Sequence, residues 1–479
     1  MKNKNDKIKI TFIVFVVFFL LSWIIEGGVY DSTTGLFTSV GITRMGLFDI
    51  ISVIYSAFYY KIADIVFLLA VGGCYQVLSN TLMYRKLVDK VSSLIKGKEA
   101  IAMVVITTLM ALYASITSNI MILFVAAPFI VTIFLRNGYN RLTAFSAGFG
   151  GMFLGYLGLT YGTYNMTYLN EAIAVDVNEL MIQKWVILLI AVVLFNVFSI
   201  LYMKKHADNK DQTKYDLYAA EELKEEKKLK VKGKEKKVRV WPLVIIGVLS
   251  LLVLLLGYID WINSFNVNFF SKLYTNIINS VTIADIPVIS SILGSRLTAF
   301  GTWTDLLYAT FVLMVGIVII SLIGKVKFND FIEQFGIGMK KMIRVAFIYG
   351  FATSVLFLIS MYPWPITFVN YLAGSGTFNI IVVLLLAILS SVLAGDPNLC
   401  AYMFGTGMAV LYGNDLTALS LLWRIGGAIA TFVGPTSIIL LATLTYLNIP
   451  YKNWLKYIWK FLFSFILLVL ILVALAVYV

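Results

Sequence analysis

The sequence predicts an all-α polytopic membrane protein built from two inverted repeats, each with a re-entrant hairpin and a broken transmembrane helix. Three observations predict this class. Of the 479 residues, 60% are hydrophobic and only 13% are charged, which is more apolar surface than a soluble domain of this length can bury. The apolar residues fall in long stretches, and the two halves of the chain present the same order of segments.

A helix needs roughly 20 mostly apolar residues to cross a membrane. Seven stretches meet this requirement and are predicted to be complete spans: 10–27, 62–82, 182–203, 240–261, 304–324, 342–361 and 455–479. The first stretch follows a basic start, as in a signal sequence, but no small-residue cleavage site comes after it. We therefore expect it to stay in the protein as a first helix.

Four other apolar stretches contain interruptions. Residues 141–165 and 416–446 are rich in Gly and small polar residues, which favours a single crossing with a break inside it. Residues 99–136 and 377–412 carry a polar interruption near the middle, which favours a hairpin that enters and leaves on one side. Such irregular backbone is tolerated at membrane depth only where it faces protein or water.

The basic residues indicate how the chain is oriented. Lys and Arg cluster between the apolar stretches that the model places on the inside, as the positive-inside rule requires for a cytoplasmic N-terminus. The net charge of +13 therefore reports topology, and a nucleic-acid partner is not expected. We predict a multi-pass protein of the cell (inner) membrane.

The chain divides into four predicted segments. Residues 1–205 form the first repeat, with the inner hairpin 99–136 and the broken helix 141–165, and residues 206–239 are a charged cytoplasmic linker. Residues 240–303 supply a linking helix and an outer loop. Residues 304–479 form the second repeat, with the outer hairpin 377–412 and the broken helix 416–446.

The two repeats align at a shift of about 276 to 279 residues. The predicted sidedness places the first hairpin inside and the second outside, so the repeats run antiparallel through the membrane. Two hairpin tips and two helix breaks then meet near the midplane, where unpaired backbone groups and polar side chains replace the water of a solute or ion. The candidate substrate- and ion-binding residues are Ser118, Asn119, Thr160, Gly162, Thr163, Asp396, Asn398, Gly434, Pro435, Thr436 and Ser437. For each of them a helix cap or an interhelical hydrogen bond is an alternative role.

Charged residues at membrane depth are also candidates. Arg424, about one turn before an expected break at 426–427, joins the binding candidates, and Asp396 is the preferred proton or cation site. Asp64 and Asp305 lie near the starts of spans, where N-capping is the favoured role. No catalytic residue or resident cofactor is predicted, and the only metal expected is Na⁺ at the hairpin tips. Na⁺ or H⁺ is the expected coupling ion.

Sequence motifs are similar to those of the YfcC-like permease family. The run GPTSIILLATLTYLNIPYKNWLKY from Gly434 resembles that family's PTS and IPY...WLK signature, and WIIEGGVYD at 23–31 resembles the end of its first helix. The family is related to anaerobic C4-dicarboxylate carriers and arginine/ornithine exchangers within the ion transporter superfamily. The resemblance implies a homodimer with a scaffold domain and a moving transport domain in an elevator mechanism.

These features favour a secondary active transporter of a small charged organic solute, an amino acid or a carboxylate, working by ion coupling or exchange. A C4-dicarboxylate carrier is the narrower alternative. The sequence has no Walker-type GxxxxGK[ST] segment for ATP. A membrane-embedded enzyme is disfavoured because no HExxH motif, buried histidine or pair of carboxylates on one helix face occurs. A non-transporting assembly subunit is the remaining alternative, but it has no need of polar breaks in both halves.

Overall fold

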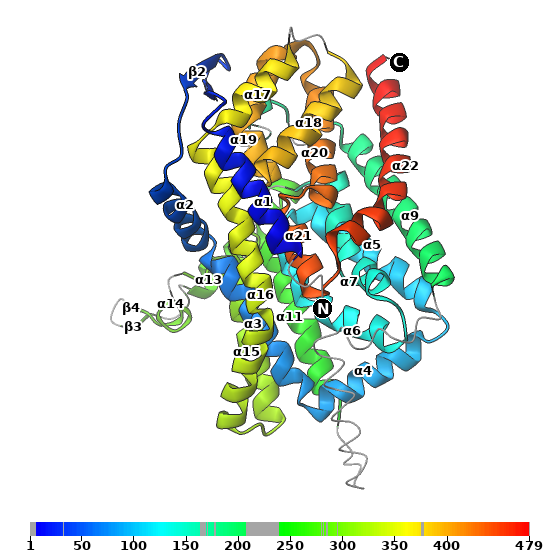
Figure 1. Ribbon diagram of the computed structural model, residues 1–479. Coiled ribbons are helices and arrows are strands. Elements are labelled where there is room, and N and C mark those ends of the chain that lie inside the picture. The colour runs from blue at the N-terminus through cyan, green and yellow to red at the C-terminus, as the bar shows by residue number, and fades with distance from the viewer. Residues whose placement is uncertain are drawn as a thin grey trace.

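The computed structural model describes residues 6–478 except residues 32, 163–168, 170, 177–178, 207–238, 279, 281, 284–285, 295 and 375–377. The described chain is almost entirely helical (Figure 1). Its helices α1 to α7 are Asp6–Leu21, Leu47–Tyr60, Ile62–Ser79, Leu82–Ile95, Glu99–Thr117, Ala127–Arg136 and Arg141–Gly158, with the 3-10 helix η1 (Ile120–Val125) before α6. The linker predicted at 206–239 lies almost wholly outside the described residues.

Most of the remaining helices belong to the second half of the chain. They are α9 (Met181–Lys205), α11 (Trp241–Tyr258), α15 (Leu306–Ile323), α16 (Phe328–Met361), α17 (Trp364–Ala373), α18 (Ile380–Ala394), α19 (Pro397–Leu411), α20 (Leu416–Val433), α21 (Ile438–Tyr446) and α22 (Tyr451–Tyr478), with the 3-10 helix η2 (Gly413–Asp415) before α20. Eight helices of the described chain are long and apolar enough to cross a membrane. The predicted all-α polytopic class is confirmed.

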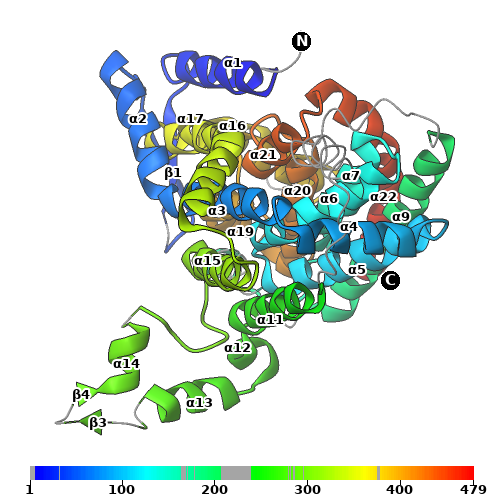
Figure 2. The ribbon, with the colours of Figure 1, turned by 90° about the horizontal axis from the view of Figure 1, so that it is seen from below.

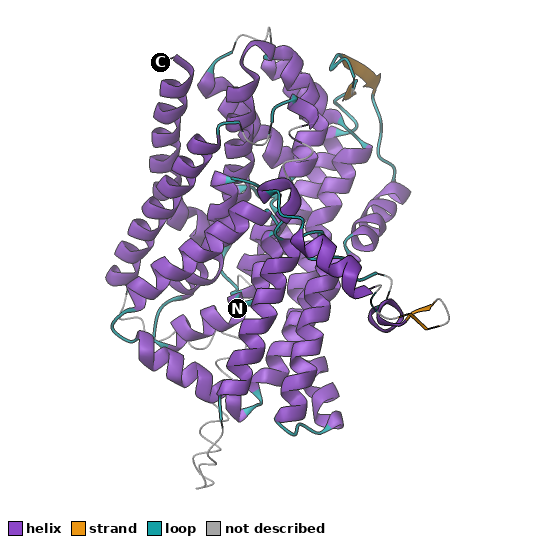
Figure 3. Cartoon of the chain, turned by 180° about the vertical axis from the view of Figure 1, so that it is seen from behind, coloured by secondary structure: helices purple, strands orange, loops and turns teal. Residues whose placement is uncertain are grey.

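The strands are few and peripheral. In the described residues, β1 (Gly27–Tyr30) pairs antiparallel with β2 (Phe37–Gly41), and β3 (Thr282–Ile283) pairs with β4 (Ile286–Pro287). The second pair sits on an arm with α12 (Trp261–Phe265), α13 (Phe269–Ile278) and α14 (Val288–Leu293), which reaches away from the helices (Figure 2). Seen from behind, the strands lie at the edges of a helical body (Figure 3).

The helices form two groups. Helices α1, α2, α3, α11, α15 and α16 pack on one another and are called here the α3–α16 bundle. Helices α5, α6, α7, α9, α18, α19, α20 and α22 form the second group, the hairpin bundle. Figure 2 shows them side by side, and α21 continues from α20 and packs on α16, so it joins the two.

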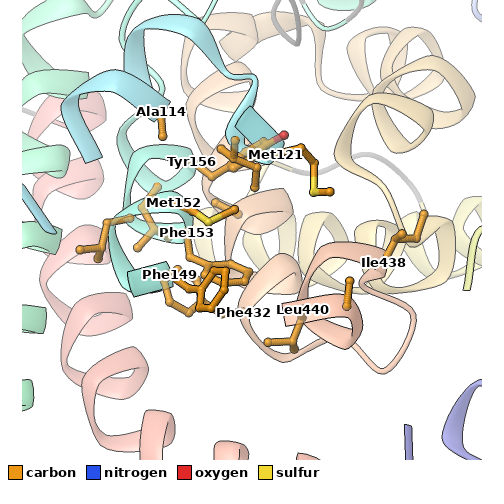
Figure 4. Close-up of a cluster of buried hydrophobic side chains, with 14 of the residues drawn as sticks. Ala114, Met121, Phe149, Met152, Phe153, Tyr156, Phe432, Ile438 and Leu440 are labelled. Atoms are coloured by element: carbon orange, nitrogen blue, oxygen red, sulfur yellow. The ribbon is translucent and has the colours of Figure 1, made fainter. Parts of the chain in front are cut away.

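The core of the hairpin bundle lies where α5, η1 and α7 meet α20 and α21. Phe153 packs against Phe432 with ring centroids 5.3 Å apart, and Phe149 and Met152 lie beside them (Figure 4). These side chains are almost fully buried. Burying apolar surface of this kind stabilises the contact by about 1.5–3 kcal/mol per side chain, which fixes the two halves of the chain against each other.

The α3–α16 bundle is held by close backbone contact and amide side chains. A Cβ added to Gly338 would lie 2.2 Å from the carbonyl oxygen of Gly72, so only glycine allows the two helices to approach this closely. Gln76 Nε2 donates to Gln334 Oε1 at 3.1 Å, and Lys341 Nζ donates to Gln76 Oε1 at 2.6 Å. Side-chain hydrogen bonds of this type stabilise the packing of helices in lipid, where no hydrophobic effect drives them together.

Several predicted boundaries differ from the structure. The span predicted at 10–27 is α1, which ends at Leu21. The span predicted at 342–361 is the second part of α16, which begins at Phe328 because its amphipathic lead contains no proline. The break expected at 426–427 is wrong, since α20 is continuous from Leu416 to Val433. Gly426 instead allows close packing on α18, because its added Cβ would lie 2.5 Å from Ala387 Cβ.

Candidate functional site

The first predicted hairpin turns at Ser118 and Asn119. Helix α5 ends with Ser118 in the left-handed conformation (φ 53°), whose N–H donates to the Ala114 carbonyl at 2.9 Å. The chain then enters η1, so this tip, called tip 1 (residues 117–121), opens into an irregular turn. Asn119 Nδ2 donates to the Thr304 carbonyl at 3.2 Å and links tip 1 to the other bundle.

The break after α7 holds tip 1 from behind. Thr160 is fully buried, its N–H donates to Ser115 Oγ at 3.0 Å, and the two hydroxyl oxygens lie 2.9 Å apart. The N–H of Gly162 donates to the Ser115 carbonyl at 3.2 Å, and Ser118 Oγ donates to the Gly162 carbonyl at 3.3 Å. Thr160 and Gly162 therefore brace the tip, while Thr163 lies outside the described residues.

The second predicted hairpin turns at Gly395 and Asp396. Gly395 ends α18 in the left-handed conformation (φ 74°), and Asp396 is the N-cap of α19. Its Oδ1 accepts hydrogen bonds from the N–H groups of Asn398 at 2.9 Å and Leu399 at 3.0 Å. Pro397 occupies the first helical position, where a missing N–H costs nothing. This tip, called tip 2 (residues 395–399), is a regular helix start.

The break between α20 and α21 holds tip 2. Thr436 Oγ1 donates to the Val392 carbonyl, and a Cβ on Gly395 would lie 3.1 Å from the Thr436 carbonyl oxygen. Ser437 Oγ donates to the Thr431 carbonyl at 3.0 Å and caps α21. Gly434 and Pro435 form the bend between the helices. Of the four predicted break residues, Thr436 supports tip 2, and none of the four belongs to the described cavity lining.

The two tips meet in one cavity of about 380 Å³ between the bundles. Tip 1 contributes Ser118 and Asn119, and tip 2 contributes Asp396 and Asn398, so the structure brings these four predicted residues together. The rest of the described lining comes from α2, α3, α7, α15, α16, α21 and adjoining residues: Tyr60, Lys61, Ala63, Asp64, Ile120, Met121, Tyr156, Thr304, Asp305, Leu306, Tyr349 and Ile439.

Four charged side chains line the cavity among the described residues, namely Lys61, Asp64, Asp305 and Asp396. Asp305 is the N-cap of α15, as predicted, and its Oδ1 accepts from the Leu307 N–H at 2.9 Å. Two carboxylates thus also stabilise helix starts, where the helix dipole favours negative charge. With three carboxylates and one ammonium, the lining favours positively charged groups.

Asp64 has a role that capping does not explain. The N-cap of α3 is Lys61, and Asp64 lies in the first turn. Its Oδ2 accepts the Tyr349 hydroxyl at 2.7 Å and lies 3.4 Å from Lys61 Nζ. Sequence reasoning missed Lys61 and Tyr349 as site residues. The one sequence signal for this part of the site was Asp64, a carboxylate in the first turn of an apolar helix. Its partner Tyr349 is 285 residues away along the chain.

Arg424 lies behind the cavity. It is 6% exposed and lines a small pocket of about 20 Å³ with Asn398, Pro397 and Tyr156. Because Asn398 and Tyr156 also line the large cavity, Arg424 is one layer of side chains away from it. Its predicted approach to the site is therefore indirect in this conformation.

Known proteins resemble the chain over its whole length. It is similar to the YdaH transporter of Alcanivorax borkumensis, with 12% identity, 99% of this chain and 98% of that chain covered and a TM-score of 0.41. It is also similar to Neisseria gonorrhoeae MtrF, whose structure illuminates a class of antimetabolite efflux pumps, with 15% identity, 99% and 95% coverage and a TM-score of 0.39. No curated protein sequence matches the chain.

The family assignment rests on the sequence. The model of the family described as DcuC, C4-dicarboxylate anaerobic carrier, matches residues 5–478. This match covers nearly all of the chain and agrees with eight apolar helices of spanning length in the described residues. The chain therefore belongs to the DcuC family of anaerobic C4-dicarboxylate carriers and is an integral membrane transporter.

Proposed function

We propose that the protein is a secondary active transporter of a small charged organic solute, an amino acid or a carboxylate, that works by ion coupling or exchange. The observation that carries this proposal is the cavity of about 380 Å³ in which tip 1 and tip 2 face each other. Pockets that hold small molecules have about this size and contain a few convergent polar groups. The predicted binding residues Ser118, Asn119, Asp396 and Asn398 line it.

The charge of the lining supports a coupling cation. A carboxylate solute that enters beside Asp64, Asp305 and Asp396 is repelled unless positive charge enters with it. Na⁺ or H⁺ supplies that charge in symport, and the ammonium group of an amino acid supplies part of it within the solute. Asp396, at tip 2, is the proposed cation or proton site.

The arrangement of two bundles supports the mechanism. The cavity lies between the α3–α16 bundle and the hairpin bundle. The side-chain hydrogen bonds that cross between them include Asn119 to the Thr304 carbonyl at the cavity and Tyr75 to the Val125 carbonyl at 2.6 Å. We propose an elevator mechanism in a homodimer of the inner membrane, with the N-terminus in the cytoplasm. The antiparallel repeats and the YfcC-like membership belong to the same proposal.

A C4-dicarboxylate carrier is the second candidate, because the matching family model bears that description. The two candidates differ in the cation required. A dicarboxylate dianion needs at least one accompanying cation to bind in this lining. A basic amino acid carries positively charged groups within the molecule.

Uptake by purified protein in liposomes tests the proposal. Radiolabelled basic amino acids and C4-dicarboxylates are supplied with and without Na⁺ gradients, pH gradients and unlabelled solute inside. We expect saturable uptake of one class, and counterflow if the protein exchanges solutes. If folded protein moves neither class under any gradient, the proposed substrates are wrong.

Replacing Asn119 and Asn398 together with Ala separates a transporter from an assembly subunit. We expect uptake to be lost while the unfolding temperature and the elution volume stay near those of the wild type. Unchanged uptake would show that the tips do not bind the solute.

A further inference from the structure

Lys61 occupies a distinctive position in the cavity. It is the single residue between α2 and α3, serving as the C-cap of one helix and the N-cap of the other. This junction fixes its backbone, since its N–H donates to the Ala57 carbonyl at 3.2 Å and its carbonyl accepts from Ile65 at 3.0 Å. Among the described residues of the lining it carries the one positive charge.

The contact between Lys61 and Asp64 is loose on the Lys61 side. Nζ lies 3.4 Å from Asp64 Oδ2, beyond the 2.7–2.9 Å of a charge-assisted hydrogen bond. The same Asp64 oxygen accepts the Tyr349 hydroxyl at 2.7 Å. Asp64 therefore keeps a strong hydrogen bond when the ammonium moves, and the Lys61 side chain is 39% exposed, so that a solute in the cavity can reach it.

Every solute class considered above carries at least one carboxylate. A carboxylate in a lining with Asp64, Asp305 and Asp396 needs a positive partner to offset its loss of water. Arg424 is excluded from this role in the present conformation, since it lies outside the described lining of the large cavity. Lys61 is the side chain that meets this need.

We propose that Lys61 is a specificity-determining residue that binds the solute carboxylate, and that Asp64, held by Tyr349, releases the ammonium to it. The proposal rests on the function proposed above and deepens it, because it names the group that recognises the anionic end of the solute. Asp64 acts as a positioning residue that holds the ammonium in the cavity while no solute is bound.

The test compares carboxylates with their amides. Purified wild type, Lys61→Gln, Lys61→Arg and Asp64→Asn are reconstituted in liposomes, and inhibition of labelled arginine or succinate uptake is measured with arginine against argininamide and succinate against succinamide. Thermal unfolding with the same compounds gives a binding readout that does not depend on transport.

The expected result is that Lys61→Gln loses the preference for the carboxylate over the amide. Lys61→Gln lowers the apparent affinity for the carboxylate about ten- to hundredfold and changes that for the amide little, as expected for loss of a charged hydrogen bond. Lys61→Arg keeps most of the preference. Asp64→Asn, the matched control, removes the carboxylate that competes with the solute for the ammonium and leaves the carboxylate affinity equal or higher.

Three outcomes overturn the proposal in different ways. If wild type transports a carboxylate and Lys61→Gln keeps its preference over the amide, Lys61 does not bind the solute and the proposed function stands. If Lys61→Gln and Asp64→Asn weaken carboxylate and amide binding equally, the pair is structural. If wild type shows neither uptake nor a thermal shift with any carboxylate, the proposed function fails along with this proposal.

Discussion

The two hairpin tips are supported alike but differ in what they present to the cavity. Each first arm ends in a left-handed residue, Ser118 or Gly395, and each tip is held by a threonine of the following broken helix, Thr160 or Thr436. Beyond that point tip 1 opens into η1, while tip 2 starts α19 directly. Tip 1 therefore offers neutral polar groups, and tip 2 offers a carboxylate fixed at a helix start. Two tips that are held in the same way but present different groups, neutral in one and charged in the other, fit a site that binds a solute and a cation together.

The largest expected effect comes from the carboxylate that only tip 2 carries. Asp396→Asn keeps a side chain that caps helices well but removes the charge, so the apparent affinity for the coupling cation or the solute falls about ten- to hundredfold. The concentration dependence of uptake, measured with and without Na⁺ and pH gradients, gives the change. Asp305→Asn, which alters the other capping carboxylate of the lining, has a smaller effect. Equal wild-type transport by both variants would remove Asp396 from the site.

An intermediate effect comes from exchanging the left-handed residues of the two tips. Gly395→Ser places a side chain at φ 74° near the Thr436 carbonyl, and the left-handed conformation costs a non-glycine residue about 1–2 kcal/mol. Ser118→Gly relieves the same strain in tip 1, which offsets the loss of the hydrogen bond from Ser118 Oγ to the Gly162 carbonyl, so its stability stays near that of the wild type. Thermal unfolding in detergent measures both. Equal destabilisation by the two variants would mean that backbone strain does not distinguish the tips.

The smallest effect comes from the two bracing threonines. Thr160→Val removes the hydroxyl contacts to Ser115, and Thr436→Val removes the hydrogen bond to the Val392 carbonyl. Each is expected to lower the free energy of unfolding by about 1 kcal/mol. Similar losses in thermal unfolding support equivalent braces. A loss confined to one variant would show that the tips are held by different contacts.

Local signals in the sequence located the tips and the second break. A polar interruption within an apolar run predicted turns at 118–119 and 396–398, and Pro435 with its small neighbours predicted the bend before α21. These features depend on a few adjacent residues, so they are visible without the fold. The turn at Gly395 and the cap at Asp396 lie where that pattern placed them.

The rest of the site depends on packing between distant segments of the chain and could not be predicted from local sequence patterns. Asp64 gains Tyr349 as a partner only when α3 packs on α16. A carboxylate at the start of a span has the same local pattern whether it caps a helix or faces a cavity. The helix break expected at Gly426 was wrong for a related reason. A glycine that permits close helix packing has the same local sequence pattern as one that breaks a helix.

The close approach of Gly72 and Gly338 has a consequence for measuring motion. Helices in backbone contact cannot slide past each other without a clash, so α3 and α16 form one stiff unit over the 18 residues of α3, a length of about 27 Å. Asp64 and Tyr349 lie on this unit and are joined by a hydrogen bond. Probes on it supply a fixed reference, against which any displacement of Asn119 and Asp396 is measured.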